Sequence, residues 1–175
     1  MLPPTPAGND IGHLDVCSSW VSFLPTDYSP RTCVGLGMND AELAANEQLS
    51  SYDVHDLNVN PVLPYDDEAF DVITNVVSVD YLAKPLELFA DMERVLKPGG
   101  LAIMSFSNRM FWTKAIKLWT ESNEYQRVLV CSGYFRYTRG FGDLEAFEIT
   151  LPNGDNPMFV VQARKTGGEL PDSKL

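Results

Sequence analysis

The chain contains 175 residues, enough for one domain with a sizeable core and too few for two domains of ordinary size. Lysine and arginine number 13 against 24 aspartates and glutamates, and the net charge of -11 disfavours binding to nucleic acid or to an anionic membrane. Hydrophobic residues make up 45% of the chain, although no apolar run is long enough to cross a bilayer. We therefore expect a soluble, folded, single-domain protein.

The ends of the chain and its cysteines indicate where the protein resides. The opening MLPPTPAGND has neither the basic nor the apolar stretch of a secretory signal. The three cysteines, Cys17, Cys33 and Cys131, have no metal-ligand spacing, which predicts reduced thiols and no metal site. We expect an intracellular protein, cytoplasmic by default, or plastid if a transit peptide precedes this chain. Residues 1–10 and 166–175 are predicted to be mobile, which leaves residues 11–165 as the domain.

The first part of the chain alternates between short apolar runs and connecting segments. Residues 11–17 and 32–36 are predicted to be buried strands, joined by a short helical or irregular segment over 19–30. Asn39 has Glu42 three positions after it, the capping-box arrangement that predicts the start of a short helix.

The middle of the chain carries the strongest signals. Residues 51–54 are a candidate strand, and 70–79 are β-branched and apolar on both faces, as in a strand buried on both sides. A helix is predicted to begin at 84–85, to continue with apolar residues at helical spacing, and to end at 98–100. Residues 101–106 follow at once as another strand.

The last third predicts one more helix and a pair of strands. Asn108 is expected to cap a helix that continues past Trp119. Residues 143–150 and 157–165 read as two strands of a hairpin. Alternating strands and helices followed by this pair predict an α/β fold, with a mostly parallel sheet, helices on both faces and a C-terminal antiparallel hairpin. Such sheets bind ligands at the carboxyl ends of their strands.

Polar or small residues follow the first three predicted strands. Ser18 and Ser19 belong either to a small-residue loop that approaches a nucleotide or to a plain helix-capping turn. Ribose-binding sites often place a carboxylate after the second strand, where this chain has Gly37. Asn39 or Asp40 nearby could substitute for it, although Asn39 is better explained as a cap. Asp56 after the third strand is either an acceptor for an adenine amine or a solvated loop carboxylate.

The fourth and fifth strands are followed by candidate substrate-binding residues. Asp80 and Tyr81 come after the fourth strand, and Asp80 is either a base or orienter, or a cap of the next helix. Arg109 comes after the fifth strand and is either an anchor for an anionic substrate group or a member of a surface ion pair.

Two longer motifs resemble those of class I S-adenosylmethionine-dependent methyltransferases, of the type 11, small-molecule kind. Residues 63–73 (LPYDDEAFDVI) and 92–101 (MERVLKPGGL) are similar to the family's LPF-x-D-x-x-FD pattern and to its helix ending in RVLKPGG. More narrowly, residues 16–22, 35–39 and 105–109 resemble an uncharacterised methyltransferase-like group of plants and algae.

The resemblance implies a Rossmann-like sheet of seven strands with the last one antiparallel, and S-adenosylmethionine lying across the ends of the first, second and fourth strands. Tyr81 matches a position that often touches the substrate. Cys17, Ser19 and Val21 occupy the family's three glycine positions, and Gly37 replaces its ribose-binding carboxylate. The predicted cofactor-binding set is Asp15, Cys17, Ser18, Ser19, Gly35, Gly37, Met38, Asp56, Leu57, Asn75 and Val76.

The sequence thus predicts methyl transfer from S-adenosylmethionine to an unidentified small-molecule acceptor by direct in-line displacement. Tyr81 and Asp80 are expected to orient or deprotonate the acceptor. No metal, nucleic acid or membrane partner is expected. The alternative is a non-catalytic methyltransferase-like interaction module, which the replaced glycines and carboxylate favour. A nicotinamide-dependent reductase would require GxGxxG after the first strand and an acidic residue after the second, and the sequence has neither.

Overall fold

The computed structural model describes residues 10–149 and 156–167. Within them one sheet contains seven strands: β1 Gly12–Val16, β2 Thr32–Gly37, β3 Ser51–Val54, β4 Phe70–Val76, β5 Leu96–Ser107, β6 Phe141–Glu148 and β7 Met158–Lys165. The helices are α1 Asp40–Ala44, the 3-10 helix η1 Val79–Tyr81, α2 Pro85–Val95, α3 Lys117–Thr120 and α4 Glu124–Tyr137. The predicted hairpin turn and almost all of the predicted mobile ends lie outside the described residues.

The sheet has the strand order β3-β2-β1-β4-β5-β7-β6. Strands β1 to β5 pair in parallel, whereas β7 is antiparallel to both β5 and β6. This arrangement confirms the predicted α/β fold, its seven strands and its C-terminal antiparallel pair. The strand order reverses on either side of β1, so the loops after β1, β2 and β4 surround a natural ligand-binding crevice.

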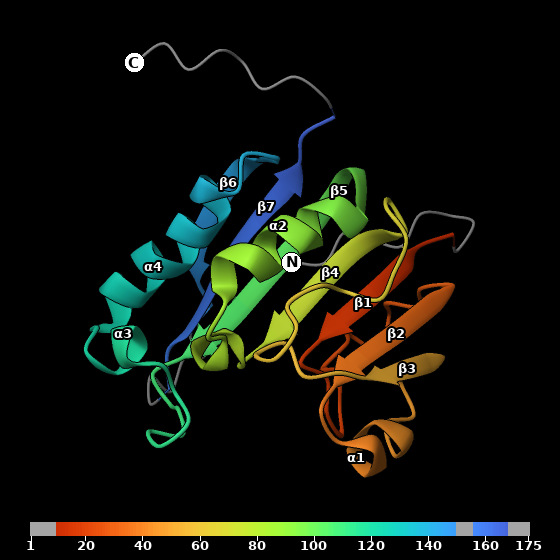
Figure 1. Cartoon of the computed structure of the whole chain (residues 1–175), viewed down its shortest axis with the longest axis horizontal. Helices are drawn as coiled ribbons and strands as arrows, with labels where there is room; N and C mark the ends of the chain where they lie inside the picture. Colours follow the sequence, from red (N-terminus) through yellow and green to blue (C-terminus); the bar gives the residue numbers. More distant parts are fainter. Residues whose placement is uncertain (1–9, 150–155, 168–175) are drawn as a thin grey trace.

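Helices α2 and α4 lie across the same face of the sheet (Figure 1). The main core is beneath them, where the ring of Phe89 packs edge-on against Tyr134 and Phe135, with ring centroids 5.4 and 4.8 Å apart. The expected helical cover on the other face is incomplete because residues 18–31, between β1 and β2, are irregular. Among the residues of this connection, Tyr28 packs against Ile11 and Val72.

Arg94 of α2 explains why the two long motifs occur together. Its guanidinium donates hydrogen bonds to the carboxylates of Asp91 and Asp67, at 2.7 and 2.8 Å, and to the carbonyl oxygens of Leu63 and Tyr65, at 3.0 and 2.8 Å. The arginine of the second motif therefore holds the backbone of the first motif against α2. Charge-assisted bonds of this kind are among the strongest in proteins.

Strands β4 and β5 differ most in extent from the sequence prediction, whereas the bounds of the other strands agree to within two residues. Strand β4 ends at Val76 and not at residue 79, because Val77 adopts a left-handed conformation with a φ of 48° and turns the chain into η1. Strand β5 begins at Leu96, directly after α2, and not at Leu101. The added residues include Gly99, whose φ of 78° suits glycine, and the register against β4 shifts there.

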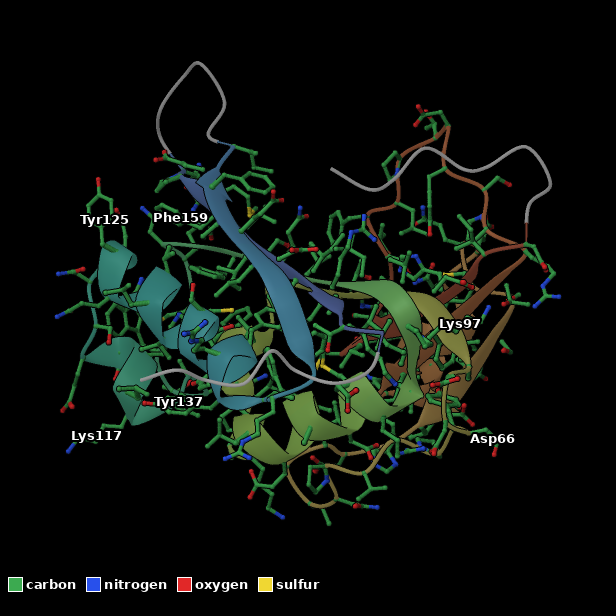
Figure 2. All side chains as sticks on the ribbon, turned by 90° about the horizontal axis from the view of Figure 1, so that it is seen from above. Asp66, Lys97, Lys117, Tyr125, Tyr137 and Phe159 are labelled. Carbon is green, nitrogen blue, oxygen red and sulfur yellow. The ribbon has the colours of Figure 1, made fainter. Side chains whose placement is uncertain are left out.

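The predicted helix beginning at Asn108 is wrong, and α4 was not predicted. Residues 108–116 are irregular, and α3 has only four residues. Helix α4 begins at Asn123, whose side chain forms a capping box with Gln126. Its apolar side chains point in several directions, and Tyr125 and Tyr137 are exposed on the outer side of the helix (Figure 2). No amphipathic stripe therefore marks this helix in the sequence. No helix of the described chain is long and apolar enough to cross a membrane.

Candidate functional site

A cavity of about 850 Å³ lies at the carboxyl ends of the parallel strands. Its lining comes from the segments that follow β1, β2, β3 and β4 and from the irregular segment after β5: Cys17, Ser18, Ser19, Leu36, Gly37, Met38, Asn39, Asp40, Glu42, His55, Asp56, Leu57, Asn58, Ser78, Tyr81, Leu82, Phe111 and Lys114. A smaller cavity of about 360 Å³ lies between segments 24–31 and 48–50.

The loop after β1 packs directly against the end of β2. The backbone N–H of Ser18 donates to the carbonyl oxygen of Leu36 at 2.9 Å. A Cβ atom at Gly37 would overlap the backbone oxygen of Ser18, so the close approach of this loop requires glycine at position 37. Cys17 begins the loop with a φ of 61°, the conformation that glycine adopts at lowest cost.

Helix α1 and its cap fasten the same loop from the other side. The Ser19 hydroxyl donates to a carboxylate oxygen of Glu42, and the amide of Asn46 donates to the backbone oxygen of Ser19 at 2.9 Å. Asn39 is the N-cap, as predicted, and accepts from the N–H groups of Ala41 and Glu42. The predicted capping box is modified, since Glu42 Oε1 accepts from the side-chain amide of Asn39 at 2.7 Å.

The segment after β3 forms the next part of the wall. Asp56 Oδ1 accepts from the backbone N–H of Asn58 at 2.9 Å, and Leu57 is buried beside it. The Asn58 amide donates to the backbone oxygen of Tyr81 at 3.0 Å, which ties this segment to η1 after β4. Met38, two-thirds exposed, faces the cavity from the end of β2.

Tyr81, Phe111 and Lys114 form the end of the cavity nearest to β4 and β5. The Tyr81 hydroxyl accepts a hydrogen bond from the backbone N–H of Phe111 at 3.0 Å. The Lys114 ammonium lies 5.5 Å from the centroid of the Phe111 ring. Burial, together with the charge of nearby Asp80, raises the pKa of Tyr81, so its phenol keeps its proton near neutral pH.

A chain of buried polar groups supports the loop after β1 from behind. Thr74 Oγ1 donates to Asp15 Oδ1 at 3.3 Å, His13 Nε2 lies 2.8 Å from Thr74 Oγ1, and His13 Nδ1 lies 3.0 Å from the Tyr28 hydroxyl. Because the threonine proton is given to Asp15, His13 Nε2 is the donor to Thr74 and Nδ1 accepts from Tyr28. Burial lowers the pKa of His13 to about 4 and keeps the ring neutral.

Eight of the predicted site residues line the cavity: Cys17, Ser18, Ser19, Gly37, Met38, Asp56, Leu57 and Tyr81. Six others do not: Asp15, Gly35, Asn75, Val76, Asp80 and Arg109. Asp15, Asn75 and Asp80 are buried, and the amide of Asn75 donates to the backbone oxygen of Val16 at 3.1 Å. A Cβ at Gly35 would overlap the side chain of Leu49, so this glycine serves packing.

Several cavity residues were not predicted as part of the site. Glu42, Asn58, Ser78, Phe111 and Lys114 all line it. Glu42 was recognised only as a capping residue, and Phe111 and Lys114 lay inside a segment that was expected to be a helix. Only their position in the sequence indicated a place in the site, because each of these residues follows a strand of the parallel sheet within a few positions.

Comparison with known families assigns the class of protein. Residues 14–104, slightly more than half of the chain, match a family described as a methyltransferase domain. The chain therefore belongs to this methyltransferase family, whose cofactor is S-adenosylmethionine. No curated protein sequence matches the chain.

Several solved structures share the fold of this chain at low sequence identity. The chain is 16% identical to a chain of the complex between the Haloferax volcanii Trm112 methyltransferase activator and a methyltransferase, with a TM-score of 0.68 and coverage of 95% of this chain and 87% of that one. An S-adenosylmethionine-dependent methyltransferase from Mesorhizobium loti is 14% identical, with a TM-score of 0.64 and 94% coverage of both chains. The [4+2]-cyclase SpnF has a TM-score of 0.63, 16% identity and coverage of 94% and 79%, so the fold does not fix the reaction.

The chemistry of the cavity lining fits an adenosine-containing cofactor. Glu42 and Asp56 present carboxylate oxygens that accept hydrogen bonds from hydroxyl and amine groups. Leu36, Met38 and Leu57 provide the apolar surface that a purine ring requires. Residues around one cavity thus offer both kinds of contact.

The conformation of Cys17 predicts which substitutions the loop tolerates. Cys17→Gly should unfold with nearly the wild-type free energy, because relief of the left-handed strain, about 1 kcal/mol, offsets the lost side-chain contacts. Cys17→Val should be about 1 to 2 kcal/mol less stable than Cys17→Gly, since a β-branched residue is strained at this φ. Urea unfolding of both variants measures the difference. Equal stability of the two would contradict the assigned loop conformation.

The buried carboxyl group of Asp15 predicts a pH-dependent difference in stability. Burial raises the pKa of Asp15 to about 6, from 3.8, although the hydroxyls of Ser18, Ser22 and Thr74 oppose this. The ionised Asp15 therefore lowers the free energy of unfolding above pH 6, and this destabilisation disappears as the pH falls from 6 to below 4. Asp15→Asn should be more stable than wild type by about 2 kcal/mol at pH 8 and equal to it near pH 4.

Urea unfolding at pH 8, 6 and 4 tests this prediction. Asp66→Asn, at an exposed loop position (Figure 2), is the matched control and should follow the wild type throughout. A stability difference for Asp15→Asn that does not change with pH would show that the Asp15 carboxyl group titrates normally.

Proposed function

We propose that this chain transfers a methyl group from S-adenosylmethionine to a small-molecule acceptor by direct in-line displacement. The observation that carries the proposal is the continuity of the cavity, which joins the carboxylates and apolar residues after β2 and β3 to Tyr81 and Phe111 on the other side of β1. One end suits adenosine, and the other end provides room and polar contacts for a second molecule. A net charge of -11 argues against a nucleic-acid acceptor.

The bound cofactor would supply a methyl group on a positively charged sulfur, so the protein needs no nucleophile of its own. Catalysis then depends chiefly on positioning the acceptor in line with the methyl–sulfur bond. In such a transfer the electron pair of the methyl–sulfur bond would stay on sulfur, and an oxygen or nitrogen acceptor would release its proton to solvent water. Walls of fixed residues around both molecules reduce the entropy lost on reaching this arrangement.

Tyr81 is the residue we assign to the acceptor. Its hydroxyl oxygen accepts the N–H of Phe111 and its proton interacts with the Asp80 carboxylate, so the remaining lone pair of this oxygen is the group that would receive a hydrogen bond from the acceptor. The raised pKa keeps that proton in place near neutral pH, so Tyr81 orients the acceptor and does not deprotonate it. Lys114 adds a positive charge at the same end, a role that the sequence assigned to Arg109.

Asp80 acts behind Tyr81 as a positioning residue. Only 3% of Asp80 is exposed, and its backbone oxygen accepts the N–H of Ile116 at 2.9 Å, next to α3. Burial raises the pKa of this carboxyl group to about 6, so it is mostly ionised at pH 7. Burial raises the pKa of Tyr81, and the charge of Asp80 and its contact with the phenol raise it further, so Asp80 keeps the phenol oriented and protonated.

A non-catalytic interaction module is the second candidate. It is favoured by the three residues in the glycine positions of the loop after β1 and by the exposed side chains of Trp20, Val21 and Phe23 on the same connection. One solved structure with this fold is a complex of a methyltransferase with an activator protein. In this role the chain would bind a partner through the surface of that loop.

Methyl transfer is tested with radiolabelled S-adenosylmethionine and a panel of phenols, amines and carboxylic acids. Label should pass to at least one acceptor class, and Tyr81→Phe should lower the rate about tenfold while leaving the affinity for S-adenosylhomocysteine unchanged, because one hydrogen bond to the acceptor is lost. Tyr125→Phe, on the exposed side of α4, is the matched control and should retain full activity (Figure 2). Tight cofactor binding without transfer to any acceptor would favour the interaction module.

A further inference from the structure

Nucleotide-binding sheets of this kind usually place a ribose-binding carboxylate after the second strand. That position, the end of β2, is Gly37, and a Cβ there would overlap the backbone oxygen of Ser18. A carboxylate at residue 37 is therefore sterically excluded by the same loop that packs against β2. A ribose with two hydroxyl donors still requires an acceptor on this wall of the cavity.

Glu42 of α1 lies on that wall and is held in place by two donors. The Ser19 hydroxyl bonds to Oε2, and the Asn39 amide bonds to Oε1 at 2.7 Å. An ionised carboxylate has about four lone-pair positions, so each of these oxygens can accept one further hydrogen bond. Both oxygens are thus fixed before a ligand arrives, which lowers the entropic cost of binding.

We propose that Glu42 binds the ribose hydroxyls of S-adenosylmethionine in place of a carboxylate at position 37, and that Ser19 is its positioning residue. This assignment rests on the proposed function, since it requires that the cavity hold the cofactor. It also gives a reason for serine at one of the three glycine positions. The hydroxyl of Ser19 reaches across from the loop after β1 and orients the carboxylate supplied by α1.

Asp40 is the competing carboxylate on the same helix. It also lines the cavity, and its Oδ1 accepts from the Tyr52 hydroxyl at 3.2 Å. Tyr52 belongs to the edge strand β3, so this contact draws Asp40 toward the outside of the sheet. Glu42 bonds instead to Ser19 in the loop after the central strand β1. Asp40 is thus the competing assignment on the same turn of helix.

Calorimetric titration with two probes tests the assignment. The probes are S-adenosylhomocysteine and its 2′,3′-dideoxyribose analogue, which lacks both hydroxyls. Wild-type protein should bind the analogue about tenfold or more weakly than S-adenosylhomocysteine, because hydrogen bonds to a charged acceptor are lost. Glu42→Gln should weaken binding of S-adenosylhomocysteine and should distinguish the two probes by a much smaller factor, because a neutral amide oxygen replaces the charged acceptor. Asp40→Asn tests the competing carboxylate and should still distinguish the two probes, whereas Asp66→Asn, outside the cavity, is the matched control and should behave like the wild type with both.

The role of Ser19 is tested by the ratio of the affinities for S-adenosylhomocysteine and for the dideoxyribose analogue. Ser19→Ala should reduce the discrimination between the probes, and Ser19→Thr, which keeps the hydroxyl, should restore it. If Ser19 had a purely structural role, Ser19→Ala would weaken the binding of both probes by the same factor. Thermal unfolding of each variant checks that it is folded, and the wild-type comparison of the two probes needs no variant at all.

The outcomes separate this inference from the proposed function. If the wild type binds S-adenosylhomocysteine and does not distinguish the analogue, or if Glu42→Gln discriminates as the wild type does, the ribose assignment is wrong and the cofactor site stands. If discrimination is lost in Asp40→Asn and kept in Glu42→Gln, Asp40 is the ribose ligand. If the folded wild type binds neither probe, both the assignment and the proposed function are wrong.

Discussion

The contact between the loop after β1 and the end of β2 determines the shape of the candidate site. The backbone of Ser18 bonds to Leu36 and lies so close to Gly37 that no side chain fits there. The same contact places Ser19 opposite Glu42 of α1. Cys17 takes the left-handed turn that makes this approach feasible. This loop therefore has a defined shape, and the Ser19 side chain bonds to Glu42 of α1.

Most of the fold was predictable because its strands carry strong local signals. The β-branched run of β4 and the paired motifs around Arg94 identified a parallel sheet and the family. Helix α4 was missed because Tyr125 and Tyr137 are exposed and leave no apolar stripe. The helix expected from Asn108 failed because a single capping residue is a weak signal. Tertiary contacts, such as the bond from Phe111 to Tyr81, hold that segment in an irregular form.

Part of the site could be predicted from the sequence, because residues that directly follow a parallel strand lie at the edge of the sheet where ligands bind. Asp56 and Tyr81 follow their strands and line the cavity. Asp15 and Asn75 lie within theirs and are buried, where they support the loops from behind. The contact of Glu42 with the site could not be predicted from the sequence, because it depends on a hydrogen bond with Ser19, 23 positions away. Local pattern identifies a cap, whereas only the folded chain brings the two side chains together.

The central claim, that the larger cavity is the cofactor site, is tested most directly by mapping backbone amide shifts by NMR as S-adenosylhomocysteine is added. Shifts are expected to concentrate in residues 17–19, 36–40, 42 and 55–58, which line that cavity. Shifts confined to residues 24–31 and 48–50, around the smaller cavity, would contradict it. The absence of any shift at saturating ligand concentration would also contradict it.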